Sequence, residues 1–312
     1  MINFATLQGL SIPEGVVTQI TDASGRVIWA VSGGKVVLEV EKITSNTYAG
    51  ETTYNNEQFI LLDIYPKTNG TVKVTYGGLT KTITDTSGAE EPNAQQVFFG
   101  TFNGVSDSVT TPASGTLTIE GGFYAFGCSS FQTDSKATNV GYCGCVTSIS
   151  DFGGMNDIAS YTFRGCDKLV CQELPEGITS IGDYAFAMVG TSAAVTGGSG
   201  YNLTWKTAME GGTLVLPSTI KSIGSYAFTS AKGLSNGSKT VYPTYFAKVK
   251  IRATTPPTLG TQPFGPDFTA GFANGSTVTN RVYSIEVPQG CGDIYKAADG
   301  WSYYANFIVE AS

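Results

Sequence analysis

Histidine is absent from this sequence of 312 residues. Its absence excludes Ser-His-Asp and Cys-His catalysis, histidine-ligated metal sites and histidine-based pH switching. Charge is also sparse, because Asp, Glu, Lys and Arg make up only 14% of the chain. With 18 basic residues, a net charge of −7 and no basic block that could neutralise phosphates, nucleic-acid binding is disfavoured.

Long apolar runs are missing as well. No uninterrupted apolar stretch is long enough to span a bilayer, so we expect no transmembrane helix and no membrane insertion. The first ten residues, MINFATLQGL, have neither the positive charge nor the apolar length of a secretory signal, so we expect none there.

Turn-forming residues, in contrast, are abundant. The chain contains 39 glycines and 12 prolines, which together exceed the usual share of about 12%. Its hydrophobic content of 41% is sufficient for a packed core. This composition predicts many tight turns, as in a mainly β protein with short strands.

A nine-residue phrase occurs twice in the chain. Residues 178–186 read ITSIGDYAF, residues 220–228 read IKSIGSYAF, and a Leu-Pro pair precedes each copy at the same distance. One such unit cannot bury its apolar face alone, whereas stacked units share a core. We therefore expect a solenoid whose core contains the matching positions of both copies, Ile178, Ile181, Phe186, Ile220, Ile223 and Phe228.

Weaker copies extend the array. Residues 146–152 echo the first half of the phrase, residues 158–163 echo its second half, and residues 123–128 share an aromatic–Ala–Phe–x–Cys ending. From Phe163 to Phe186 is 23 residues, and from Phe186 to Phe228 is 42, which is one period plus a 19-residue insertion. Insertions in repeats map to loops on one face, often the binding face.

The pattern L-P-x-x-I-x-x-I-G-x-Y-A-F resembles the BspA-type bacterial leucine-rich repeats. Residues 251–259 and 295–304 resemble the C-terminal closure of such arrays, so the resemblance covers about residues 122–312. Insertions around 188–212 and 230–247 depart from it. Most such proteins are secreted or surface adhesion proteins, so the resemblance implies binding rather than catalysis.

The N-terminal third resembles virion proteins of phages and prophages from gut bacteria. The resemblance rests on the openings at residues 1–10, 15–20 and 25–29, and on residues 76–83 and 98–105. Virion proteins are made in the cytoplasm and released by lysis, which accounts for the missing secretion signal.

The expected fold class is mainly β, in three regions. Residues 1–32 carry a hairpin that either packs on the next domain or serves as an anchor or oligomerisation segment. Residues 33–120 have the short alternating strands of an immunoglobulin-like β-sandwich, with a type I′ turn at Asn69-Gly70. Residues 121–312 form the leucine-rich-repeat solenoid and its C-terminal cap, which includes a helical turn or two within 291–298 and the aromatic residues Trp301, Tyr304 and Phe307.

The cysteines and carboxylates give weaker signals. We interpret most of the six cysteines as small core residues, while a disulfide from Cys143 or Cys145 to a neighbouring repeat stays an alternative. Glu173 and Asp183 could approach one another across a solenoid turn, but a glycosidase needs two positioned carboxylates, one of them with a raised pKa. We expect no enzyme, no metal and no cofactor.

The aromatic residues of the insertions are better ligand-binding candidates. Tyr201 and Trp205 lie in the first insertion, and Tyr242, Tyr245 and Phe246 lie in the second. Aromatic rings in polar loops bind sugars or protein pockets, although these rings could instead pack within their own loops.

These observations predict a phage virion-associated binding protein of the tail-fibre or receptor-binding type. It would attach to a host cell-surface glycan or protein by multivalent contacts, beside other virion proteins and as a homo-oligomer, with a trimer as one option. The alternatives are a capsid or tail decoration protein, a bacterial cell-surface adhesin, and an enzyme acting on surface glycans.

Overall fold

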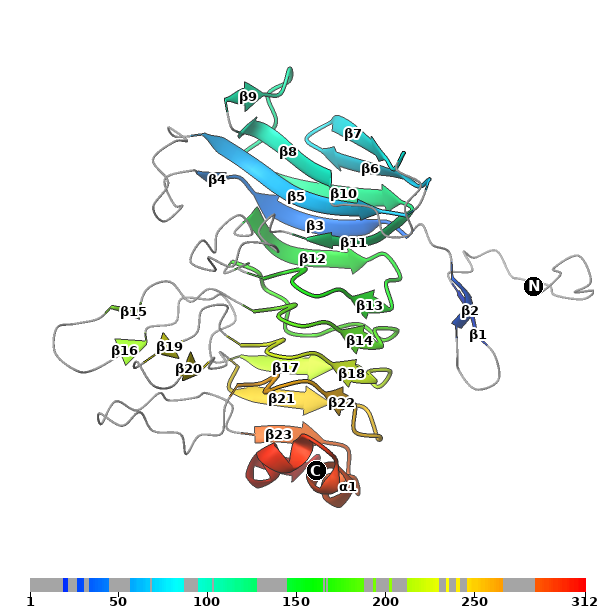
Figure 1. The fold of residues 1–312 in the computed structure, drawn as a ribbon, viewed down its shortest axis with the longest axis vertical. Helices are drawn as coiled ribbons and strands as arrows, with labels where there is room; N and C mark the ends of the chain where they lie inside the picture. Colours follow the sequence, from blue (N-terminus) through cyan, green and yellow to red (C-terminus); the bar gives the residue numbers. More distant parts are fainter. Residues whose placement is uncertain are drawn as a thin grey trace, which may run out of the picture.

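The computed structural model describes residues 19–21, 27–30, 34–44, 57–67, 69–86, 95–102, 104–127, 145–164, 166, 168–187, 193–194, 202–203, 212–229, 234–235, 240–241, 246–265 and 284–312. The fold is mainly β, as predicted. Antiparallel sheets form one end of an elongated stack, coils of parallel strands continue it, and a short helical segment closes the other end (Figure 1).

The first antiparallel sheet has the strand order β12-β3-β10-β6-β7. Buried and more exposed residues alternate along β3 and β6, so one face of each strand is buried and the other faces outward. Its strands are β3 (Val36–Glu41), β6 (Thr71–Tyr76), β7 (Leu79–Thr84), β10 (Ser114–Gly121) and β12 (Val146–Phe152).

The second antiparallel sheet has the order β11-β5-β8-β9, with β4 also paired to β5. Tyr76 of the first sheet contacts Phe99 of the second edge to face, at 5.7 Å between ring centroids. The two sheets therefore share an aromatic contact in the core. The strands are β4 (Ile43–Thr44), β5 (Gln58–Pro66), β8 (Gln95–Phe102), β9 (Val105–Ser106) and β11 (Phe123–Gly127).

The type I′ turn predicted at Asn69-Gly70 is wrong. Asn69 has a positive φ of 56°, but Gly70 does not share it, and the strands on either side belong to different sheets. The hairpin turn lies instead at Gly77-Gly78, where φ is 56° and 81° between the paired strands β6 and β7. Two successive positive φ angles are the requirement of a type I′ turn. Near the N-terminus, β1 (Gln19–Thr21) and β2 (Val27–Ala30) also pair as an antiparallel hairpin.

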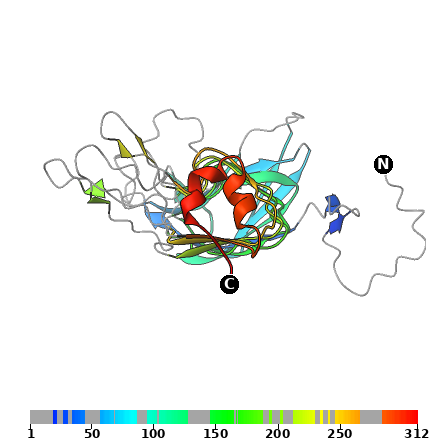
Figure 2. The ribbon, with the colours of Figure 1, turned by 90° about the horizontal axis from the view of Figure 1, so that it is seen from below.

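The coils stack through two parallel sheets, one of short strands and one of longer strands (Figure 2). The short strands are β13 (Asp157–Ile158), β14 (Ser180–Ile181), β18 (Ser222–Ile223) and β22 (Thr258–Leu259). The longer strands are β17 (Thr213–Leu216), β21 (Lys248–Ile251), β23 (Ser284–Val287) and β24 (Ile308–Glu310).

β12 joins the antiparallel sheets to the coils. It pairs antiparallel with β3 on one side, and on the other Ser148 forms a parallel bridge with Val170 of the first coil. β11, at residues 123–127, likewise pairs with β5. The hydrogen bonding of the antiparallel sheets therefore continues past residue 120 and passes into the coils.

The placement of β12 corrects the alignment of one weak repeat copy. Residues 146–152 do not take the short-strand position of the Ile-x-x-Ile-Gly phrase, because that position is filled by β13. They lead into the longer-strand side of the stack instead. The weak copy at residues 158–163 is confirmed as a repeat unit, because Ile158 is in register with Ile181, and Ile181 is in register with Ile223.

A ladder of aromatic rings runs through the centre of the coils. Phe163 stacks on Phe186 at 5.1 Å, Phe186 on Phe228 at 5.3 Å, and Phe228 on Phe264 at 5.9 Å between centroids. Phe126 of β11 meets one end of the ladder and Trp301 of the cap meets the other. Each coil therefore buries its phenylalanine only because a neighbouring coil covers it.

A glycine sets the spacing of successive coils. A Cβ added at Gly224 would lie 2.5 Å from the backbone nitrogen of Asp183, and one at Gly182 would lie 2.3 Å from that of Ser160. The coils therefore approach too closely for any side chain at this position. Next to it, the Asp183 carboxylate accepts a 2.6 Å hydrogen bond from the Ser225 backbone N–H of the following coil.

The cap closes the last coil with α1 (Gly292–Ala297) and a 3-10 helix (Trp301–Phe307). Trp301 is fully buried, and its indole N–H donates to the Pro257 carbonyl at 2.7 Å. Tyr295 and Tyr304 donate in the same way to Ala253 and Gly265. Among the described residues, neither of these helices nor any other is long and apolar enough to cross a bilayer.

Candidate functional site

The regular stacking is interrupted between β12 and the first coil. The Val170 N–H donates to the Thr147 carbonyl at 2.8 Å. Four residues later the chain pairs with β17 instead, where the Leu174 N–H donates to the Val215 carbonyl. Within the described residues, no backbone hydrogen bond joins 149–155 to 172–176. Pairing resumes only where Thr179 donates to Asn156 at 2.6 Å.

Two irregularities of β12 explain the interruption. The register of β12 against β3 shifts between Val146 and Ser148 and again between Ile149 and Asp151. Such bulges bend a strand and increase its twist. After the second shift, β12 follows β3 in the twisted antiparallel sheet rather than the adjacent coil.

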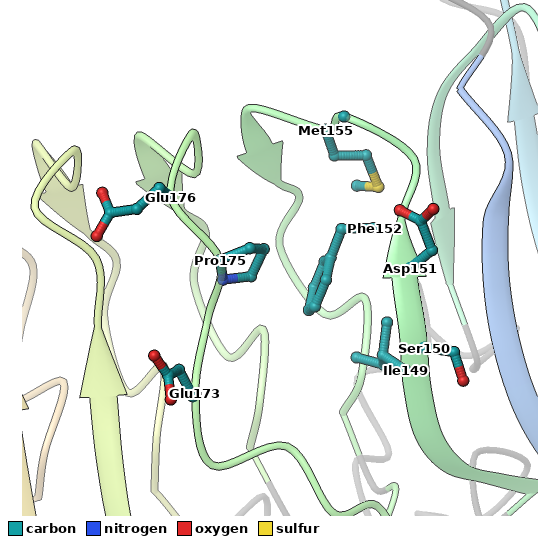
Figure 3. A pocket seen from close by; sticks show the side chains of 9 residues that line it. Ile149, Ser150, Asp151, Phe152, Met155, Glu173, Pro175 and Glu176 are labelled. Atoms are coloured by element: carbon teal, nitrogen blue, oxygen red, sulfur yellow. The ribbon is translucent and has the colours of Figure 1, made fainter. Parts of the chain in front are cut away.

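The interruption leaves an open groove of about 550 Å³ (Figure 3). Phe152 projects from the end of β12 toward Pro175 of the coil, with Ile149 and Met155 beside it. Ile149, Phe152 and Met155 are half-buried and pack against the main core. The groove therefore has an apolar floor. Its lining consists of Ile149, Ser150, Asp151, Phe152, Gly154, Met155, Glu173, Pro175 and Glu176.

Three exposed carboxylates surround this floor. Asp151 accepts a hydrogen bond from the backbone N–H of Gly153 at 2.7 Å. Glu173 contacts the guanidinium of Arg252 at 2.6 Å, and Glu176 lies 3.9 Å from the same group. With three carboxylates and one cation, the rim is net negative.

Glu176 is held firmly in its ionised form. Partial burial opposes ionisation, but hydrogen bonds from Ser218 and the charge of Arg252 outweigh it, so the pKa of Glu176 lies below its ordinary value. The Ser218 hydroxyl donates to this carboxylate at 2.7 Å. A general acid needs a raised pKa, so this carboxylate is suited to electrostatic binding rather than to proton donation.

The suggested approach of Glu173 to Asp183 is not realised as a pair. Glu173 bonds to Arg252, whereas Asp183 accepts from the Ser225 backbone of the next coil. Within the part of the chain that the structure describes, no three cysteine or carboxylate side chains are grouped so that they could hold a metal ion.

Tyr201, Trp205, Tyr242 and Tyr245, the four aromatic residues proposed as ligand-binding, lie outside the described residues. Two short hairpins of the same insertions are described, β15–β16 (Ala193–Ala194 with Asn202–Leu203) and β19–β20 (Leu234–Ser235 with Thr240–Val241). Both lie on the same flank of the stack, opposite the short parallel strands (Figures 1 and 2).

Phe246 is not a ligand-binding residue. It is buried, and its ring meets Phe228 of the central ladder at 6.1 Å. The second insertion therefore ends before Phe246, whose ring belongs to the core.

The repeat positions themselves lie in the core. The six residues are at most 3% exposed: Ile178, Ile181, Phe186, Ile220, Ile223 and Phe228. Cys145, Cys166, Cys171 and Cys291 are buried thiols, while Cys143 lies outside the described residues. Burial raises the pKa of the Cys171 thiol to about 12, which keeps it protonated and unreactive.

The sequence did not single out the groove. Ile149 and Phe152 of its floor come from β12, whose segment was aligned with the wrong half of the repeat, and Met155 follows three residues later. A usable signal was the Gly153-Gly154 pair directly after Phe152, because both glycines have positive φ, of 63° and 71°, where the chain leaves the strand.

Comparison with known families gives one match. The BspA type leucine rich repeat region matches residues 140–199 and 206–252 in six copies. These ranges contain the groove and three of the four stacked phenylalanines of the aromatic ladder, Phe163, Phe186 and Phe228. The match supports the leucine-rich-repeat assignment of this part of the chain and favours a surface-binding, adhesin-like protein. No curated protein matches the chain.

Proposed function

We propose that this protein is a non-enzymatic, adhesin-like binding protein that attaches to a surface glycan or protein without a cofactor. The observation that carries the proposal is the stack of BspA-type coils, several of which carry an insertion at the same corner. The sequence insertions 188–212 and 230–247 follow Phe186 and Phe228 of successive coils, and the described hairpins β15–β16 and β19–β20 lie within them.

The common corner is what favours binding. Each insertion follows the central phenylalanine of its coil and precedes the next longer strand. Successive coils lie in register, as the pairing of β17 with β21 and of β21 with β23 illustrates. Insertions from neighbouring coils therefore begin side by side, and loops on one face of a repeat stack commonly form its binding face.

Within these insertions, Tyr201 and Trp205 flank β16 in the sequence, and Tyr242 directly follows β20. We propose these three residues and Tyr245 as the aromatic contacts to the partner. Aromatic rings offer large apolar faces with a polar edge, which suits both sugar rings and protein pockets.

More specifically, residues 33–120, extended by β11 and β12, form an immunoglobulin-like sandwich that attaches the protein to its particle, and the coils form a leucine-rich-repeat solenoid that presents the loops. The setting is a phage virion, on which several copies, for example a trimer, add weak sites into firm attachment. The alternative settings are a bacterial cell surface and a virion decoration protein that has no receptor.

The test is binding of the full chain to arrays of glycans and of bacterial surface proteins. The variant Tyr201→Ala/Trp205→Ala should lose at least about tenfold in affinity, since loss of a central aromatic anchor costs more than 1 kcal/mol. Tyr303→Ala is the matched control, because Tyr303 is an exposed ring on the cap. Unchanged binding by the double variant would refute the aromatic contacts, and absence of any array ligand would refute the adhesin-like role.

The setting needs a different measurement. An antibody against this chain, applied to particles and to cells from the source culture, should label tail fibres in electron micrographs if the virion proposal is right. Label confined to the cell envelope would favour the bacterial adhesin, and label on capsids would favour decoration.

A further inference from the structure

We propose that the groove between β12 and residues 172–176 binds an extended peptide segment of a partner protein, one that carries lysine or arginine next to apolar residues. The segment would add a strand at the edge of β12. This inference goes beyond the proposed function, because the end of β12, which lines the groove, and the insertion hairpins β15–β16 and β19–β20 lie on opposite flanks of the stack (Figure 1).

The first argument is the open strand edge. β12 pairs with β3 through its whole length on one side, from Val146 to Phe152. On the other side, its described pairing with the next coil ends at the parallel bridge between Ser148 and Val170, in which Thr147 accepts from Val170. Beyond this bridge, the edge of β12 has no backbone hydrogen bond to 172–176 among the described residues and offers backbone groups to an incoming strand, and such edges bind extended peptides in many complexes.

The second argument is that the facing wall is also extended chain. Residues 172–174 are committed to β17 on their far side, through the bonds between Leu174 and Val215 and between Val215 and Gln172. The groove therefore lies between two extended segments. It occupies the plane of the longer parallel strands, in which β17, β21, β23 and β24 are joined by direct backbone hydrogen bonds. A single extended segment of a partner is the shape that completes this sheet.

The third argument is chemical. Ile149, Phe152 and Met155 are apolar side chains only half-covered by the protein itself. Asp151, Glu173 and Glu176 stand around them, and Arg252 is the cation that contacts two of the three. Successive side chains of a strand point to opposite faces, so apolar and basic side chains that alternate along a segment would lie on different faces. The apolar side chains would cover the apolar floor, and the basic side chains would pair with the carboxylates of the rim.

A glycan fits these features less well. The half-exposed ring is a phenylalanine, which lacks the polar edge of tyrosine or tryptophan, and Met155 adds no hydrogen-bonding group. Backbone N–H and C=O groups at a strand edge match the repeat of a peptide. A peptide partner therefore uses the apolar floor, the acidic rim and the strand edge together.

The experiment uses the full chain and a synthetic octapeptide of alternating lysine and valine that carries a neutral fluorophore. Its binding is followed by fluorescence anisotropy. A second peptide replaces lysine by glutamate, and a third keeps lysine but is N-methylated at alternate residues. The glutamate and N-methylated peptides should each bind at least about tenfold more weakly, since they lose the charge pairing and the strand pairing respectively.

Two protein variants locate the site. Asp151→Lys should weaken binding of the lysine–valine peptide by at least about fivefold, because it reverses a charge on the rim. Asp299→Lys makes the same change at an exposed position in the cap and should leave binding within about twofold of the parent.

Four results would overturn the proposal. They are no saturable binding up to about 1 mM peptide, equal affinity for the N-methylated peptide, equal weakening by both variants, and displacement of the peptide by a soluble neutral β-glucan. Because the array test of the proposed function relies on Tyr201 and Trp205, failure of one experiment does not entail failure of the other.

Discussion

The glycine of the repeat phrase gives the sharpest test of how the coils are held together. An alanine at position 224 would place its Cβ 2.5 Å from the Asp183 nitrogen and 2.5 Å from the Gly182 carbonyl carbon. Both are backbone atoms, so neither can rotate away. Moving the coils apart would lengthen the 2.7 Å hydrogen bond from Gly224 to Ile181 and loosen the stacking of Phe186 on Phe228.

We expect Gly224→Ala to lower the free energy of unfolding by about 3 kcal/mol, at the upper end of the cost of overpacking. The chain itself supplies the matched control. The first coil has Ala159 at the equivalent position, directly after Ile158, and the coil array begins there. Ala159→Gly should therefore cost only about 0.5–1 kcal/mol, the usual entropic difference between the two residues.

Urea unfolding followed by far-UV circular dichroism and by tryptophan fluorescence would measure both values. Trp301 contacts Phe264 at the end of the ladder, so fluorescence includes a report from the coils. If Gly224→Ala unfolds within about 0.5 kcal/mol of the parent, close backbone approach does not set the coil spacing, and our explanation of the repeat glycine is wrong.

Three further outcomes are expected. Asp63 is buried in β5, and burial raises its pKa from 3.8 to about 6. The folded protein thus binds this proton more tightly than the unfolded chain, so the stability it contributes is complete below pH 3.8 and is lost as pH rises through about 6. Asp63→Asn should raise stability above that pH by up to about 3 kcal/mol, and a difference in unfolding free energy between the two proteins that stays constant from about pH 4 to about pH 7 would contradict this. Phe186→Ala should cost about 3–5 kcal/mol in urea unfolding, because the ring is buried between two others, and a loss below about 1 kcal/mol would argue against the ladder. Lys81→Met should lower the free energy of unfolding in urea by about 2 kcal/mol, because it removes the ammonium group 2.5 Å from the nearly buried Asp107 carboxylate. Adding Asp107→Asn to this variant should recover part of the lost stability.

The sequence was a good guide to the coils because their determinants are local. The isoleucine and phenylalanine positions recur at fixed offsets from one glycine, so the two strong copies identify the buried residues directly. The antiparallel strands were also predictable, since Val72, Val74 and Tyr76 alternate with polar residues along β6.

The groove and the strand partners were not predictable in the same way. The groove exists because β12 pairs with β3, more than a hundred residues earlier in the chain, and shifts register twice against it. Strand pairing of this kind depends on contacts between distant segments, which periodicity within a segment does not encode. The turn at Asn69-Gly70 failed for a related reason, since local turn chemistry does not say which sheet the next strand will join.

The position of β12 between the antiparallel sheets and the coils has a mechanical consequence. The strands run across the long axis of the stack (Figure 1). A pulling force between the antiparallel sheets and the C-terminal cap therefore acts along the hydrogen bonds that join one layer to the next. Such a load opens neighbouring layers one after another instead of shearing many bonds together, because each layer touches only the next. Under such a load we therefore expect the stack to open gradually, layer by layer, and to close again when the force is released.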